Sequence, residues 1–177
     1  GMHGAQVADV VFDGCRLPGD ALVGAEGEGL KLGLIDDGKV RLHLAALCAG
    51  LMERMIEEGR QHVLNRRQFG KPLAEQPVVA AMLADCAAEA LAARCTALEL
   101  ARARDAGTLH PAEAAAAKLF ATEAAGRVAD RVLQLHGGEG FMSGSAIERL
   151  YRDARVFRIL DGASEVQRLV IGRALLG

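Results

Sequence analysis

Apolar residues recur along most of the chain at the spacing of an α-helix. In a first segment, residues 38–65, this spacing places one set of side chains on a single helix face: Val40, Leu44, Leu47, Cys48, Leu51 and Met55. In a second, residues 77–106, the corresponding face carries Val79, Met82, Leu83, Cys86 and Ala90. In a third, it carries Leu119, Phe120, Ala124, Val128, Val132 and Leu135. The pattern therefore predicts three long amphipathic helices.

Glycine and proline mark where these helices begin and end. Residues 69–72 read Phe-Gly-Lys-Pro and stop the first helix, because neither Gly nor Pro propagates helical structure well. Pro111 suits the first turn of the third helix, and Gly137-Gly138 ends it. After a loop, two shorter helices are predicted at about residues 145–157 and 163–176.

The first part of the chain has a different pattern. Several residues there favour a strand: Val7, Val10, Val11 and Phe12. Turn residues follow at 13–14 and 18–20, so residues 7–23 predict a short hairpin or an extended arm. The predicted fold class is all-α, an antiparallel up-and-down helical bundle over residues 28–177. A short N-terminal β arm, residues 1–27, precedes it.

Composition supports helices and narrows the functional classes. Hydrophobic residues make up 51% of the 177, but aromatics only 3%, and Trp is absent. A core of Ala, Leu and Val suits closely packed helices better than a sheet. The net charge of −2 indicates neither a nucleic acid nor a membrane surface as partner. No apolar run reaches the ~20 residues that a membrane span needs.

The four cysteines predict neither a metal site nor a disulfide framework. Their positions show no CxxC spacing: Cys15, Cys48, Cys86 and Cys95. Three of them lie in Ala- and Leu-rich helical segments, which indicates buried, reduced thiols. We therefore expect a cytoplasmic protein.

The candidate chemistry centres on a charged stretch near the end of the chain, ERLYRDARVFRILDGASEVQR, residues 148–168. Its helical pattern breaks at Asp161-Gly162, just before the last predicted helix. From the residues alone, Asp161 has two interpretations. It is the N-cap of that helix, whose carboxylate accepts a backbone N–H, or it is a general base.

This stretch resembles the C-terminal signature of the acyl-CoA dehydrogenases. Two upstream motifs resemble the same family, RRQFGKPLAEQ at residues 66–76 and QLHGGEGF at residues 134–141. All three stand in the family's order and at about its spacing, so the resemblance covers nearly the whole chain. It implies the C-terminal helical bundle of a flavoenzyme, with the end of the middle β-domain before it.

The resemblance implies that a carboxylate at position 161 removes the α-proton of an acyl-CoA thioester, while the β-hydrogen leaves as hydride to FAD. The family usually has Glu there, so Asp161 is one methylene shorter. Some relatives carry their base on the first long helix instead, where this chain has Val40, which cannot titrate. The substrate-binding residues implied are Arg41, Gly162 and Arg173. In this chain His136 receives no catalytic role.

The implied FAD contacts lie in all three motifs: Arg66, Gln68, Phe69, Gln76, Gln134, Leu135, Gly137, Gly138, Ala163 and Glu165. Arg suits a pyrophosphate because its planar fork makes paired hydrogen bonds. Glycines allow close approach of a dinucleotide to the backbone, although Gly137-Gly138 also reads as an ordinary helix cap. Because most of the family's β-domain is absent, we expect FAD to be absent or weakly bound in this chain alone.

Three functions follow. The first is a domain of an acyl-CoA dehydrogenase that passes electrons to an acceptor protein or to oxygen, assembled as a homodimer or homotetramer. The second is a related flavin oxidase, similar to the nitroalkane oxidases, which use Asp as base. The third is a non-catalytic oligomerisation module.

Overall fold

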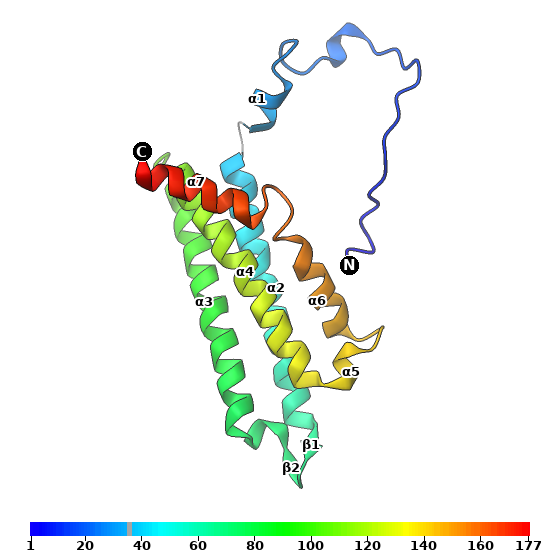
Figure 1. The fold of residues 1–177 in the computed structure, drawn as a ribbon, viewed down its shortest axis with the longest axis vertical. Coiled ribbons are helices and arrows are strands. Elements are labelled where there is room, and N and C mark those ends of the chain that lie inside the picture. Colours follow the sequence, from blue (N-terminus) through cyan, green and yellow to red (C-terminus); the bar gives the residue numbers. More distant parts are fainter. Residues whose placement is uncertain (35–36) are drawn as a thin grey trace.

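Three long helices form the body of the protein (Figure 1). In the computed structural model, which describes residues 1–34 and 37–177, they are α2 (Asp37–Asn65), α3 (Pro77–Asp105) and α4 (Pro111–His136). The shorter helices are α1 (Gly29–Leu34), α5 (Gly138–Phe141), α6 (Ala146–Val156) and α7 (Ser164–Leu176). Residues 35–36, which fall inside the predicted bundle segment 28–177, lie outside the described part.

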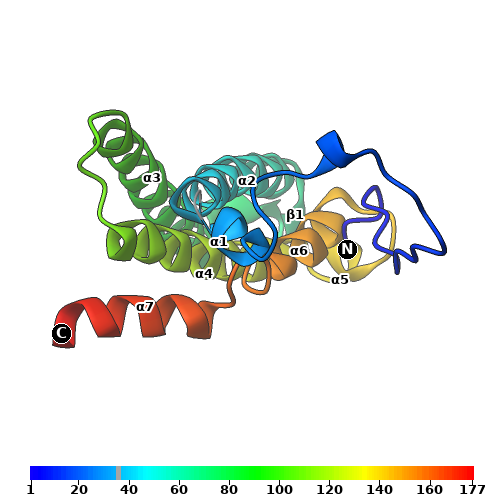
Figure 2. The ribbon, with the colours of Figure 1, turned by 90° about the horizontal axis from the view of Figure 1, so that it is seen from above.

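The three long helices run alternately up and down (Figure 1), and α4 is central. It packs against α2, α3, α6 and α7. Figure 2 shows α7 lying across the side of α4 that faces away from α2 and α3. The predicted fold class, an all-α antiparallel bundle, is confirmed. Two of the short helices were not predicted: α1, and α5, which occupies part of the predicted loop.

Local chemistry explains the helix boundaries. Pro77 and Pro111 stand at the first positions of α3 and α4, where a missing N–H is harmless. At the start of α4, the Ala112 N–H donates to Nδ1 of His110 (3.2 Å) and the His110 N–H donates to Glu113 (3.0 Å). This reciprocal pair satisfies two helix-end donors. Helix α4 stops at Gly137, whose φ is +59°.

The core consists mainly of small aliphatic residues, as the composition predicts. The buried stripe of α2 runs through Ala45, Cys48, Met52, Met55 and Val63. Two residues assigned to core faces are instead exposed, Leu47 by 49% and Phe120 by 38%. Lys118, two positions before Phe120 and on roughly the opposite face of α4, is completely buried. The pattern located the helices correctly but assigned one exposed residue in each of two helices to the buried face. Burial depends on which helices pack on each side, and the pattern does not contain that information.

The β structure in the described residues is a hairpin between α2 and α3, with two residues in each strand. Strands β1 (Arg67–Gln68) and β2 (Lys71–Pro72) pair antiparallel, with Gln68 opposite Lys71. The turn residues Phe69 and Gly70 both have positive φ, which is typical of a tight hairpin turn. Residues 1–27 form no strand; they are exposed throughout and lie as an extended arm (Figure 1). Of the two N-terminal alternatives, the arm is therefore observed and the hairpin is not.

Candidate functional site

Asp161 lies in the turn between α6 and α7. Its φ of +49° and the +83° of Gly162 make two successive left-handed residues, so the chain reverses sharply there. The N-cap of α7 is Ala163, and no side chain caps that helix. The N-cap interpretation of Asp161 is therefore wrong, because the turn places this residue two positions before the cap. Its side chain remains exposed.

The backbone of this turn is held from inside the protein. The Gly162 carbonyl accepts hydrogen bonds from Lys118 Nζ (2.7 Å) and from Gln167 Nε2 (2.9 Å). Gln167 Nε2 also donates to the Asp161 carbonyl (3.2 Å). Both donors are completely buried. Thus the carboxylate of Asp161 faces solvent while its main chain is fixed.

The other predicted substrate residues are separated. Arg41 is only 7% exposed in the first turns of α2, and its positive charge acts on the nearby Lys118. Arg173 is exposed near the end of α7, nine residues beyond the first residue of that helix and so about 14 Å along its axis. The protein therefore brings Arg41 into the environment of the Asp161 turn, and Arg173 lies at the opposite end of α7.

A second group of predicted residues lines one hollow, with a volume of about 460 Å³. The walls come from the end of α2, the hairpin, the start of α3 and the end of α4. Six of the ten residues predicted to contact FAD line it: Arg66, Gln68, Gln134, Leu135, Gly137 and Gly138. Two motifs almost 70 positions apart in the sequence therefore meet at one place. Around Gly137 and Gly138 the space where a side chain would stand is open.

The remaining four predicted FAD contacts lie elsewhere. Phe69 is at the tip of the hairpin and is 91% exposed. Gln76 is the N-cap residue of α3. Ala163 and Glu165 lie at the start of α7, beside the Asp161 turn. None of the four lines the hollow. Phe69 and Gln76 belong to elements whose other residues line it, so Ala163 and Glu165 form the separate group, beside the Asp161 turn.

The hollow also contains residues to which sequence reasoning gave no role. The rings of His62 and His136 stack with centroids 4.2 Å apart. Nδ1 of His136 lies 2.8 Å from the Val132 carbonyl oxygen. Arg66 forms an ion pair with Glu139 (3.2 Å). Burial, with the positive charge of His136 next in effect, lowers the pKa of His62. No local signal marks this pair, because the two histidines come from different helices.

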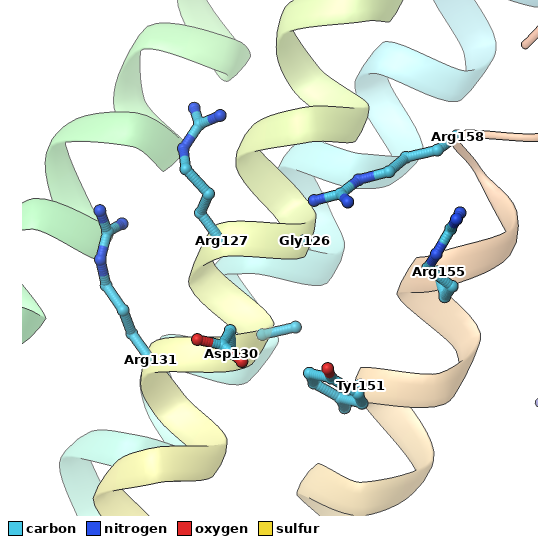
Figure 3. A pocket seen from close by; sticks show the side chains of 8 residues that line it. Gly126, Arg127, Asp130, Arg131, Tyr151, Arg155 and Arg158 are labelled. Atoms are coloured by element: carbon cyan, nitrogen blue, oxygen red, sulfur yellow. The ribbon is translucent and has the colours of Figure 1, made fainter. Parts of the chain in front are cut away.

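An arginine-rich hollow of about 380 Å³ lies between α4 and α6 (Figure 3). Arg127 and Arg131 both pair with Glu89 of α3. Arg158 reaches back across Gly126, where any side chain would overlap its guanidinium, and pairs with Glu123 (3.4 Å). These pairings give most of the arginines a structural role. In the described part of the chain, no cluster of His, Cys, Asp and Glu suits a metal ion.

Within residues 1–34 and 37–177, none of the helices has the length and apolar character required to cross a membrane.

Comparisons with known proteins point to one family. The family model for the acyl-CoA dehydrogenase C-terminal domain matches residues 38–176. The acyl-CoA dehydrogenase of Bacillus subtilis is 36% identical over the whole chain, and the acryloyl-CoA reductase (NADH) of Anaerotignum propionicum is 36% identical over 99% of it. The chain spans 47% and 45% of those two proteins, respectively.

Solved structures give the same result. The acyl-CoA dehydrogenase from Geobacillus kaustophilus superposes with a TM-score of 0.88 at 33% identity, covering 94% of this chain and 44% of that one. The butyryl-CoA dehydrogenase from Megasphaera elsdenii gives 0.87 at 32% identity, with the same coverage. Since the family model matches most of the chain, and the bundle matches these structures, the chain belongs to the acyl-CoA dehydrogenase family and carries its C-terminal domain.

Proposed function

We propose that this domain contributes the catalytic base and part of the FAD site of an enzyme that desaturates an acyl-CoA between Cα and Cβ. One observation carries the proposal. Asp161, at the signature position of the base, is exposed, caps no helix, and stands on a turn with a fixed main chain. An exposed acid that caps no helix and is held on a rigid support is suited to proton transfer.

The residues around the hollow fit part of a dinucleotide. Arg66 would hold phosphate oxygens, Gln68 and Gln134 offer amide groups, and Leu135 supplies an apolar wall. The open backbone at Gly137 and Gly138 permits close approach. Arg66 pairs with Glu139, and this ion pair would have to break before Arg66 could bind a phosphate. When bound, FAD would accept the hydride that leaves Cβ.

The chain's own contribution to the reaction is at Cα. The Asp161 carboxylate would take the α-proton as the C–H bond breaks, and the electron pair would form the new double bond as the β-hydride departs. The backbone N–H of Asp161 would donate to the thioester carbonyl oxygen, as one donor of an oxyanion hole does. The protonated Asp161 would afterwards lose its proton to solvent, to which it is exposed.

Similar proteins favour this function over the alternatives. The relatives and structures named above are dehydrogenases and a reductase, and none of these names points to an oxidase or to a non-catalytic module. A structure of the electron transferring flavoprotein of Acidaminococcus fermentans contains a chain of this fold (TM-score 0.88, 32% identity). We therefore favour a protein electron acceptor. A cytoplasmic location stays part of the proposal, supported by four free cysteines. Of the three thiols expected to be buried, Cys48 and Cys86 are buried and Cys95 is exposed.

Assembly belongs to the same proposal. The hollow and the Asp161 turn carry separate groups of predicted FAD contacts, as expected if each cofactor lies between two subunits. Phe69, exposed at the tip of the hairpin, would then reach a neighbouring copy. We accordingly propose a homodimer or homotetramer built through the bundle.

The test is Asp161→Asn in a flavin-loaded form, in which the chain is supplemented by the segments that its longer relatives carry. Asn keeps the size of Asp and removes its titratable oxygen. Anaerobic reduction of the flavin by acyl-CoA should slow by roughly 100-fold or more, with flavin binding unchanged. Asp161→Glu should retain or raise the rate. Asp105→Asn, at an exposed acid that ends α3, is the matched control. Unchanged reduction in Asp161→Asn would refute the proposal.

A further inference from the structure

Lys118 is the largest side chain that the described part of the chain buries completely. It lies on α4 next to a run of alanines, at a position that the sequence pattern did not assign to the buried face. Burial lowers the pKa of its ammonium, and the negative charge of Asp161 opposes that shift. A buried ammonium is costly unless it is paired or hydrogen-bonded. Lys118 therefore has a structural or functional reason to be there.

The hydrogen bond of Lys118 identifies that reason. Its Nζ donates to the carbonyl oxygen of Gly162, 44 residues away in the sequence. The same oxygen accepts from Gln167, which also reaches the Asp161 carbonyl. Two buried side chains, one from α4 and one from α7, thus fix consecutive peptide groups. Both peptide groups belong to the left-handed pair that carries the Asp161 side chain.

A second anchor holds the other side of the turn. Ser164 Oγ donates to Oε1 of Glu123 (2.7 Å), which lies further along α4 than Lys118. Arg158 pairs with the same carboxylate, and the Arg158 carbonyl accepts the Ser164 N–H (3.0 Å). The anchors engage the main chain or flanking side chains. They leave the Asp161 carboxylate exposed.

We propose that Lys118 is a positioning residue for Asp161. By holding the Gly162 carbonyl with a charge-assisted hydrogen bond, it keeps the turn in its left-handed form and the carboxylate at one place. Lys118 transfers no proton and contacts no substrate. The inference rests on the proposed role of Asp161 as base, and it assigns the support of that base to a residue outside all three family motifs.

Hydrogen exchange in the 177-residue chain tests the positioning. Lys118→Met fills similar space without the donor, so amides of residues 159–164 should exchange about tenfold faster, as expected when a local opening loses one such bond. Peptides from α3 should not change. Lys118→Arg, which retains a cation and donors, should restore much of the protection. Lys31→Met, at an exposed lysine paired with Glu28, is the control. Unchanged exchange at 159–164 would overturn the inference.

If Lys118→Met does not fold, Gln167→Leu provides a second test. It removes the other donor to the same carbonyl and leaves the buried charge in place. The same amides should again lose protection, since the turn would keep only one of its two donors. Wild-type protection in a folded Gln167→Leu would contradict the idea that these side chains fix the turn.

A double-mutant cycle in the flavin-loaded form tests the link to chemistry. Lys118→Met should lower the flavin reduction rate at saturating acyl-CoA by about tenfold and leave the acyl-CoA dissociation constant unchanged. In an Asp161→Asn background it should cause little further loss, because it acts through Asp161. Equal losses in both backgrounds would refute positioning. Failure of the base itself shows in Asp161→Asn alone, so the two outcomes are distinguishable.

Discussion

Replacing Gly162 by Ala measures how tightly the Asp161 turn is built. The φ of Gly162 is +83°, a region that L side chains rarely adopt. A Cβ built there would also lie 2.6 Å from Nε2 of Gln167. That nitrogen is completely buried and makes the two hydrogen bonds to the turn. The substitution therefore strains the backbone and displaces its anchor.

The two effects can be separated in magnitude. Left-handed strain for Ala costs about 1 kcal/mol. Displacing Gln167 leaves buried polar groups unsatisfied, which costs a further ~1–3 kcal/mol. Ala also restricts the unfolded chain, which offsets about 0.5 kcal/mol. The free energy of unfolding should thus fall by about 1.5–3.5 kcal/mol.

Urea unfolding followed by far-UV circular dichroism measures this loss. Gly70→Ala is the matched control, because Gly70 has a φ of +80° but no heavy atom within 4 Å of the place that a Cβ would occupy. It should lose only the strain, about 1 kcal/mol or less. Equal losses in the two variants would refute the claim that Gln167 packs against the turn. Gln167→Ala in the Gly162→Ala background should add less than it costs alone, since the clash is then relieved.

Two further predictions concern titratable groups. Burial raises the pKa of the Cys48 thiol to about 12, which keeps this thiol unreactive in the folded protein. A chromogenic disulfide should therefore label the exposed Cys15 and Cys95 in the folded protein, and the buried Cys48 and Cys86 only on unfolding. Rapid labelling of all four thiols in the folded protein would contradict the packing. The lowered pKa of His62 means that the unfolded state binds a proton more readily, so unfolding free energy should fall as pH drops below 6.5. Urea titrations at several pH values should show that the unfolding free energy of His62→Gln depends less on pH than that of the unchanged protein.

The helices were predictable because their ends carry local signals. The predicted first residues of α3 and α4 are Pro77 and Pro111, and both are observed, since proline chemistry at a helix start needs no tertiary context. Which residues of each helix are buried was less predictable. Phe120 and Lys118 are two positions apart on α4, and the groups that compensate burial of the lysine, the Gly162 carbonyl and the charge of Asp161, come from a distant turn. A local pattern contains no information about that partner.

The candidate site, too, was predictable only in part. The motifs carrying Arg66 and Gln134 could be recognised singly. Their meeting in one hollow follows because α3 returns the chain, so that α4 runs in the same direction as α2 and the two helices end side by side (Figure 1). The stacked pair of His62 and His136 could not be anticipated, because each histidine alone resembles an ordinary helix residue. The cap interpretation of Asp161 failed for a conformational reason. Two left-handed residues intervene before the helix, and sequence preferences for caps do not detect them.

The left-handed turn also bears on why Asp, and not the family's usual Glu, is compatible with position 161. Asp and Asn are several-fold enriched at positive φ, because their short polar side chains hydrogen-bond locally. At +49°, Asp161 adopts this conformation at lower cost than Glu would. The shorter side chain loses reach, so a base here requires the acyl Cα to approach the turn more closely. An approach that close tolerates little movement of the backbone, and this is the property that Lys118 and Gln167, holding the Gly162 carbonyl from within the core, are placed to supply.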